Sequence, residues 1–237
     1  MNGNRLCNSP TGDIYGHDLI QAYCGDGAAL GMQIQYSVEE KPLGTAGALQ
    51  QARRFLNEAF LVVNGDTYFG ADLSALLANH RAGGAPATLA LVKVPQTGPA
   101  KSAGRSTSRF GAVTLDAHGY VTHFAEKKRR SAGLINAGIY IFEPGIWAHF
   151  PARVPLSLED DIFPSLAAQR LLRGKVLEGY HMDIGTPESY AQFQKDVAAT
   201  ASRHLGTPPL GLRPPGRTAP CGLDRVGEVE LHLVEDR

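Results

Sequence analysis

The feature of this sequence that most constrains its fold is a short apolar run that ends in a polar turn. Residues 60–63 (FLVV) form the run, and residues 64–66 (NGD) follow it directly. A continuous apolar run bounded by turn residues is typical of a strand buried on both faces, as in a parallel sheet. Helical patterns flank it, over residues 44–56 and 73–80. This alternation of strand and helix predicts an α/β fold.

The alternation continues to about residue 200. Further strands are predicted over residues 32–36, 88–94, 110–115, 121–124, 134–142 and 176–182, and further helices over 14–24, 157–170 and 186–200. Ser157 is the predicted N-cap of its helix, because acidic residues at 159–161 occupy the first turn, where the helix dipole favours them.

The chain divides into three predicted parts. Residues 1–13 form an atypical head without periodicity, residues 14–200 form the α/β domain, and residues 201–237 form a Pro/Gly-rich linker and tail. Near the end of the tail, residues 226–234 are compatible with one further strand.

Composition argues against several classes of partner. The 237 residues include 23 Lys+Arg and 23 Asp+Glu, so the net charge gives no electrostatic reason to expect nucleic acid or an anionic membrane. No apolar run is long enough for a membrane span, and residues 1–13 lack the apolar core of a signal peptide. The three cysteines have no metal-ligand spacing, which favours a reducing, cytoplasmic location.

Two aspartates are candidate metal ligands because each follows a predicted strand. Asp66 ends the turn after residues 60–63, and Asp183 follows the strand predicted over 176–182. Ligands of α/β proteins bind at the carboxyl ends of strands, and Mg²⁺ prefers one or two carboxylates together with substrate phosphates. Either aspartate alone also fits a turn or helix-proximal residue. Together they favour a shared Mg²⁺ site.

Two further motifs are weaker signals. Lys127, after Glu126, can meet a phosphate as a point charge, although the basic run 127–130 also fits a solvated turn. Gly44 and Thr45 open a predicted helix, where a ligand can approach backbone N–H groups closely.

Taken together and in this order, the motifs resemble those of the sugar-1-phosphate nucleotidyltransferases. They are residues 23–27 (YCGDG), 36–39 (YSVE), 42–49 (PLGTAGAL), 64–66 (NGD), 110–111 (FG), 126–127 (EK), 136–138 (NAG) and 183–185 (DIG). Within that family, residues 134–138 (LINAG) and 157–159 (SLE) resemble the D-glycero-D-manno-heptose 1-phosphate guanylyltransferases. The resemblance covers about residues 14–198. It implies a three-layer, Rossmann-like fold with a mostly parallel mixed sheet, and so a nucleotidyltransferase domain over residues 14–200.

The resemblance also implies a reaction and a set of roles. The reaction transfers a nucleotidyl group from an NTP, here GTP, to a sugar 1-phosphate, here heptose 1-phosphate, and releases pyrophosphate. Asp66 and Asp183 would hold Mg²⁺, and Lys127 would bind the sugar 1-phosphate. The remaining implied contacts are with the nucleotide, from Glu39, Gly44 and Thr45, and with the sugar phosphate, from Gly111, Glu126, Asn136 and Gly138.

The chain departs from this family near its beginning. Members begin with a strand and a Gly-rich loop of the type LAGGxGTRL, followed by Pro-Lys-Pro, and the sequence contains neither. The resemblance therefore predicts a sheet without its first strands. The triphosphate would be bound by residues 1–13 or by a second chain, in a homo-oligomer or with a complementing partner. Two alternatives stay open: a non-catalytic fragment or regulatory subunit that binds an NDP-sugar, and a metal-dependent glycosyltransferase with Asp66 as the metal anchor.

Overall fold

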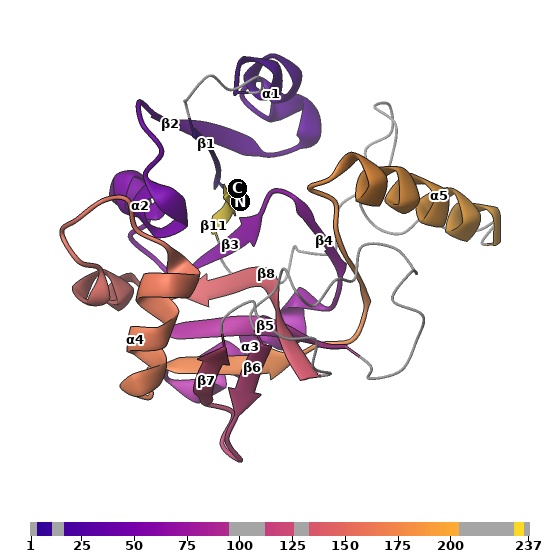
Figure 1. Cartoon of the computed structure of the whole chain (residues 1–237). Helices are drawn as coiled ribbons and strands as arrows, with labels where there is room; N and C mark the ends of the chain where they lie inside the picture. The colour runs from indigo at the N-terminus through magenta and orange to yellow at the C-terminus, as the bar shows by residue number, and fades with distance from the viewer. Residues whose placement is uncertain (1–3, 11–16, 95–111, 126–132, 204–229, 235–237) are drawn as a thin grey trace.

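The structure, a computed structural model, describes residues 4–10, 17–94, 112–125, 133–203 and 230–234. Its main sheet has the strand order β2-β1-β11-β3-β8-β5-β9, and β6 and β7 extend it beside β8 (Figure 1). The strands of this sheet are β1 (Asn4–Pro10), β2 (Gln33–Glu39), β3 (Phe60–Asn64), β5 (Ala87–Val94), β6 (Ala112–Leu115), β7 (Val121–Ala125), β8 (Gly133–Phe142), β9 (Leu172–Val176) and β11 (Glu230–Val234).

A second, two-stranded sheet pairs β4 (Thr67–Gly70) with β10 (Tyr180–Asp183) in antiparallel fashion. The helices are α1 (His17–Cys24), α2 (Gly44–Ala52), α3 (Leu73–Gly83), α4 (Phe163–Ala168) and α5 (Pro187–Arg203). In Figure 1, α5 follows β10 and extends away from the main sheet. None of the helices in the described ranges is long and apolar enough to cross a membrane.

Helices cover both faces of the main sheet, which makes the fold a three-layer α/β structure. Side chains alternate along a strand, so Phe60 and Val62 of β3 pack in one core with residues of α2 and α4. Leu61 packs in the other core, against Leu76 and Leu77 of α3. Among the described strands of this sheet, half of the pairings are parallel and half are antiparallel: β8 runs antiparallel to β3, β5 and β6, and β6 runs antiparallel to β7. The predicted mixed α/β sheet is confirmed.

The predicted N-cap at Ser157 is also confirmed. Its side chain accepts a hydrogen bond from the backbone N–H of Asp160 at 3.1 Å. The backbone N–H of Ser157 in turn donates to the Asp161 carboxylate at 2.8 Å. This hydrogen bond, aided by Arg153, lowers the pKa of Asp161 and keeps its negative charge at the positive end of the helix. The first turn, Leu158–Ile162, is π-helical, and α4 follows it directly.

The single strand predicted over residues 176–182 is wrong. The chain forms β9 up to Val176, which pairs with β5, and then β10 from Tyr180, which pairs with β4 in the other sheet. Between them, Gly179 has a φ of 156°, and a Cβ there would collide with the backbone of Gly70. The chain passes from the main sheet to the two-stranded sheet at Gly179, where only a glycine fits, and the apolar pattern of the sequence continues unbroken across this change.

Strands from the two ends of the described chain complete the sheet. Residues 4–10, in the head without periodicity, form β1, which pairs in parallel with β2. The tail forms β11 within residues 226–234, and this strand lies between β1 and β3 (Figure 1). The resemblance predicts a sheet without its first strands. In the structure, β1 and β11 lie between β2 and β3, so the sheet is continuous across the described strands.

Candidate active site

Asp66 and Asp183, the two predicted metal ligands, lie side by side. Asp66 is in the tight turn between β3 and β4, and Asp183 is the last residue of β10. The β10–β4 pairing places Asp183 in register with Thr67, the residue after Asp66. The backbone N–H of Ile184 donates to the Asp66 carbonyl at 2.7 Å, which locks the two turns together.

The two carboxylates converge on Gly185. A Cβ at Gly185 would lie 2.8 Å from Asp66 Oδ2 and 3.2 Å from Asp183 Oδ1, so both oxygens reach the same point beside the backbone. The Gly185 N–H also donates to Asp183 Oδ1 at 2.9 Å. Asp183 is buried and Asp66 is half-buried. Because any larger residue at position 185 would place its Cβ against both carboxylates, a glycine is needed for this arrangement.

This carboxylate pair fits Mg²⁺. Two carboxylates supply hard oxygen ligands, and Mg²⁺ takes its remaining ligands from water and substrate phosphates. Across the residues that the structure describes, no cluster of three or more His, Cys, Asp or Glu side chains is arranged to hold a metal ion. A complete protein cage of the kind that Ca²⁺ or Zn²⁺ uses is therefore not formed by these residues.

Gly138 of β8 borders the turn that carries Asp66. Its φ is 71°, a conformation that side-chain-bearing residues rarely adopt. A Cβ at Gly138 would lie 3.1 Å from Thr67 Oγ1 and 3.2 Å from Asn64 Nδ2. The predicted sugar-phosphate residue Gly138 therefore lies against the residues on either side of the Asp66 turn.

Asn136 is held by a buried hydrogen-bond network. Its amide nitrogen donates to Glu159 Oε1 and to the Tyr140 hydroxyl, both at 2.8 Å, and its Oδ1 accepts from the Gly138 N–H at 3.0 Å. The side chain is 2% exposed, so these contacts fix its orientation. Both amide protons are used inside the protein, which leaves Oδ1 as the atom with capacity for a ligand.

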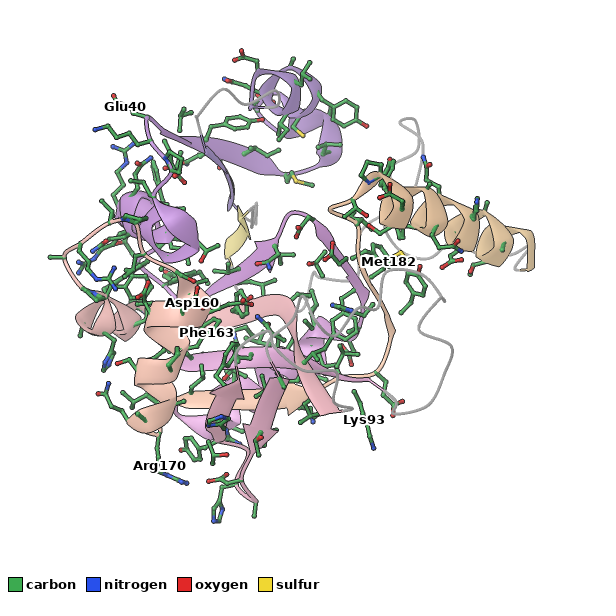
Figure 2. The ribbon with its side chains drawn as sticks, in the orientation of Figure 1. Glu40, Lys93, Asp160, Phe163, Arg170 and Met182 are labelled. Carbon is green, nitrogen blue, oxygen red and sulfur yellow. The ribbon has the colours of Figure 1, made fainter. Side chains whose placement is uncertain are left out.

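Glu159 and Tyr140 are members of this site that sequence reasoning did not assign to it. The sequence places Glu159 in the first turn of a helix, where an acidic residue has a local reason to be. Its contact with Asn136 depends on how that helical segment docks on β8, and no spacing in the sequence reports this docking. Figure 2 labels Asp160, the residue after Glu159, and Met182, the residue before Asp183.

The predicted nucleotide-side residues surround the start of α2. Glu39 is buried, and its Oε2 accepts from the Leu43 N–H at 2.8 Å. Gly44 has a φ of 75°, and a Cβ there would lie 2.6 Å from the Leu156 carbonyl oxygen. Thr45 Oγ1 accepts from the Leu158 N–H at 2.9 Å.

Backbone N–H groups at the start of α2 already have hydrogen-bond partners within the protein. The backbone N–H groups of Ala46 and Gly47 donate to the Leu156 carbonyl at 2.9 and 3.1 Å. The group that approaches Gly44 closely in the structure is therefore the backbone of residue 156. Because Leu158 precedes Glu159, the same segment contacts Thr45 on one side and Asn136 on the other. It links the nucleotide-side residues to those around Asp66.

Gly111, Glu126 and Lys127 lie outside the described residues. Their predicted roles at the sugar phosphate stay predictions.

Comparison with known proteins places this arrangement in a family. Residues 15–200 match the family described as nucleotidyl transferase. The mannose-1-phosphate guanylyltransferase of Mycobacterium tuberculosis is 37% identical over 190 residues, which are 78% of this chain and 50% of the relative. The D-glycero-alpha-D-manno-heptose 1-phosphate guanylyltransferase of Campylobacter jejuni is 33% identical over 179 residues, which are 76% of this chain and 74% of the relative. The chain thus spans half the length of the first and about three quarters of the second.

Solved structures share the fold. The crystal structure of HddC from Yersinia pseudotuberculosis aligns over 82% of this chain and 99% of its own length, with a TM-score of 0.65 and 21% identity. The sequence match, the relatives and the fold agree, and this chain belongs to the nucleotidyl transferase family.

Proposed function

We propose that this chain transfers a nucleotidyl group from an NTP, GTP in the first instance, to a sugar 1-phosphate, with heptose 1-phosphate as the first candidate. The single observation that carries the proposal is the convergence of the Asp66 and Asp183 carboxylates on Gly185. The choice of guanine nucleotide and heptose is supported by relatives that bear the names of guanylyltransferases, including two for heptose 1-phosphate.

The reaction is an in-line displacement at the α-phosphorus. An oxygen of the sugar 1-phosphate forms the new P–O bond, the bond to pyrophosphate breaks, and NDP-sugar and pyrophosphate leave. Such a displacement needs alignment and charge neutralisation, and no covalent enzyme intermediate is required. When bound, Mg²⁺ would supply Lewis-acid neutralisation of the phosphate charge at the Asp66–Asp183 pair.

The chain's own residues would divide the substrates between two sides of the site. Glu39, Gly44 and Thr45 lie on the nucleotide side, where the buried Glu39 shapes the loop before α2. Asn136 and Gly138 lie on the sugar-phosphate side, beside the Asp66 turn. Lys127 would hold the phosphate of the sugar. The proposal also places this enzyme in the cytoplasm and has it work as a homo-oligomer or together with a complementing chain.

A second candidate is a subunit that binds an NDP-sugar without turnover. The observation that favours it is that Asn136 and Gly138, the predicted sugar-phosphate residues, lie beside the Asp66 turn. Binding of a diphosphate product at these residues requires no transfer step.

The deciding experiment measures pyrophosphate release by the purified chain. We expect Mg²⁺-dependent release with GTP and heptose 1-phosphate, compared with other NTPs and hexose 1-phosphates. Asp66→Asn and Asp183→Asn should each lower kcat/KM by about 100-fold or more, because each removes a charged metal ligand. Each should change Tm by no more than a few degrees. Glu58→Gln, at an exposed carboxylate before the start of β3 and so at the opposite end of that strand from Asp66, is the matched control.

Other outcomes identify the alternatives. A folded protein that releases no pyrophosphate with any substrate pair but is stabilised by an NDP-sugar would be the binding subunit. Transfer of sugar from an NDP-sugar to an acceptor would be the glycosyltransferase. Full activity in either aspartate variant would contradict the assignment of that residue to the metal.

A further inference from the structure

Strand β11 joins two parts of the main sheet that do not pair with each other. It pairs in parallel with β1 on one side and with β3 on the other (Figure 1). Leu231 is in register with Arg5 of β1 and with Leu61 of β3. Two positions further on, Leu233 is in register with Cys7 and Val63. The strand order contains no direct β1–β3 pairing among the described strands.

The spacing of strands makes this position a slot of fixed width. Neighbouring strands lie about 4.8 Å apart, so β1 and β3 are separated by about two such spacings with β11 between them. Without β11, both strands would present unpaired N–H and C=O groups to the slot, which is costly in the middle of a sheet. The alternative is a shift of β1 and β2 by about one strand spacing to pair with β3 directly.

That shift would change the geometry of the candidate site. Strand β2 ends at Glu39, on the nucleotide side, and β3 leads into the turn that carries Asp66. The strand in the slot therefore acts on the separation between these two sides, in addition to α2, whose Gln51 side chain donates to Ser37 Oγ and to the Val38 carbonyl of β2. Misplacement by about 1 Å can lower the rate of a positioned reaction by about 100-fold, so a displacement of a whole strand spacing is not compatible with transfer.

The same chain is the favoured source of the strand. Residues 204–229 connect the end of α5 to β11, and 26 residues can extend much further than the radius of a domain of this size. A tethered segment has an effective concentration of about millimolar when its linker can span the gap. A second copy of the chain at micromolar concentration would compete poorly with it.

We propose that the interval between β1 and β3 is a strand-binding slot whose ligand is the segment Glu230–Val234 of the same chain, and that its occupancy sets the distance between Glu39 and Asp66. Recognition is through parallel main-chain pairing on both edges of the segment, as in β-strand addition to a sheet. The claim that Glu39 and Asp66 lie on the two substrate-binding sides of the site rests on the proposed function. The claim that Glu230–Val234 pairs with β1 and β3 does not depend on that function.

Thiol cross-linking in the full chain tests the pairing. With Cys24→Ser and Cys221→Ser, Cys7 is the remaining native thiol, and position 233 is in register with it. A short bifunctional thiol reagent should link Cys7 to the new thiol of Leu233→Cys within one chain. The matched control is His232→Cys, because neighbouring positions of a strand alternate between the two faces of a sheet. We expect a cross-linked monomer for Leu233→Cys and at most a trace for His232→Cys.

Proline substitution tests the requirement for the strand. In a strand paired on both edges, every interior N–H donates to one neighbour, so His232→Pro removes a ladder hydrogen bond and places a ring in the slot. We expect Tm to fall by about 5–10 °C and kcat/KM to fall by at least about tenfold at a temperature where the variant is folded. His232→Ala, which keeps the N–H, and Arg217→Pro, in the Pro/Gly-rich segment, should stay close to the parent chain.

Each result decides one claim. Equal or absent cross-linking at positions 232 and 233 would overturn the pairing, and a covalent dimer would overturn its assignment to the same chain. Parental Tm and parental activity in His232→Pro would overturn the requirement for the strand. If the parent chain shows no nucleotidyl transfer, the proposed function fails, while cross-linking and Tm still decide whether the slot binds this segment.

Discussion

At the scale of single residues, Gly185 decides how closely the two carboxylates of the site can approach. A Cβ in Gly185→Ala would lie 2.8 Å from Asp66 Oδ2, which is shorter than the van der Waals contact distance between a carbon and an oxygen. The Asp66 carboxylate would have to turn away from Asp183. We expect the Mg²⁺ concentration for half-maximal activity to rise by about tenfold or more, with Tm unchanged within a few degrees.

A matched glycine provides the control for this prediction. Gly145 is also exposed, and no atom lies within 4 Å of the position of an added Cβ there. Gly145→Ala should keep the Mg²⁺ dependence of the parent chain. A Gly185→Ala variant with the same Mg²⁺ dependence would show that the two carboxylates do not act through this point.

The residues of the site differ in how far the sequence predicts them. Asp66 and Asp183 are local signals, because each directly follows a strand and the strand end defines the edge of the sheet. Their closeness to one another is confirmed by the β10–β4 pairing. Glu159 differs because its contact with Asn136 is made across 23 positions and depends on docking of the segment that begins at Ser157.

At the scale of elements, Gly44 fixes how α2 begins. Its φ of 75° resembles the 64° of Gly84, at the end of α3. At Gly84 nothing lies within 4 Å of an added Cβ, whereas at Gly44 the Leu156 carbonyl oxygen would be 2.6 Å away. Comparing alanine substitutions at Gly44 and Gly84 therefore separates the cost of backbone strain, which both share, from the cost of collision with a neighbouring segment, which only Gly44 has.

We expect Gly84→Ala to lower the free energy of unfolding by about 1–2 kcal/mol, the cost of a left-handed conformation for a residue with a side chain. Gly44→Ala should lower it by about 1–3 kcal/mol more, because the segment at Leu156 must move. Urea unfolding monitored by circular dichroism measures both values. Equal values for the two variants would show that the Leu156 segment moves away without cost.

Elements were predictable where one pattern belongs to one element. The apolar run at residues 60–63 and the helical pattern at 73–80 are confirmed as β3 and α3. The prediction over residues 176–182 is wrong because an unbroken apolar pattern carries no record of a change of partner strand. Gly179 marks that change, although a single glycine in a strand pattern also fits a bulge.

At the scale of the whole molecule, the continuity of the main sheet was not predictable from local patterns. Residues 4–10 have no periodicity, and their pairing with β2 and β11 is a non-local property. The tail stretch 226–234 is compatible with a strand on its own, but nothing in it specifies a position between β1 and β3. Each of these two strands pairs with the other and with one further strand, so the position of each depends on partners that are distant in the sequence.

Stability of the whole molecule is coupled to pH through His80, which connects α3 to the sheet. Its Nδ1 lies 2.8 Å from Thr88 Oγ1, and its Nε2 lies 3.2 Å from Glu143 Oε1. Burial is the largest influence and lowers the pKa of His80 below its usual 6.5; Glu143 opposes this effect, while Arg81 and Arg173 add to it. The folded protein therefore holds this imidazole neutral to a lower pH than the unfolded chain does.

The direction of the pH dependence follows from proton binding. As the pH falls below about 6.5, the unfolded chain takes up a proton at His80 before the folded chain does, so the free energy of unfolding decreases. Between about pH 7.5 and about pH 5.5, Tm should therefore fall less steeply in His80→Gln than in the parent chain. His118→Gln, which removes an exposed imidazole on the β6–β7 turn, is the matched control. Parallel Tm curves for the parent chain and His80→Gln would show that protonation of His80 is not coupled to global unfolding.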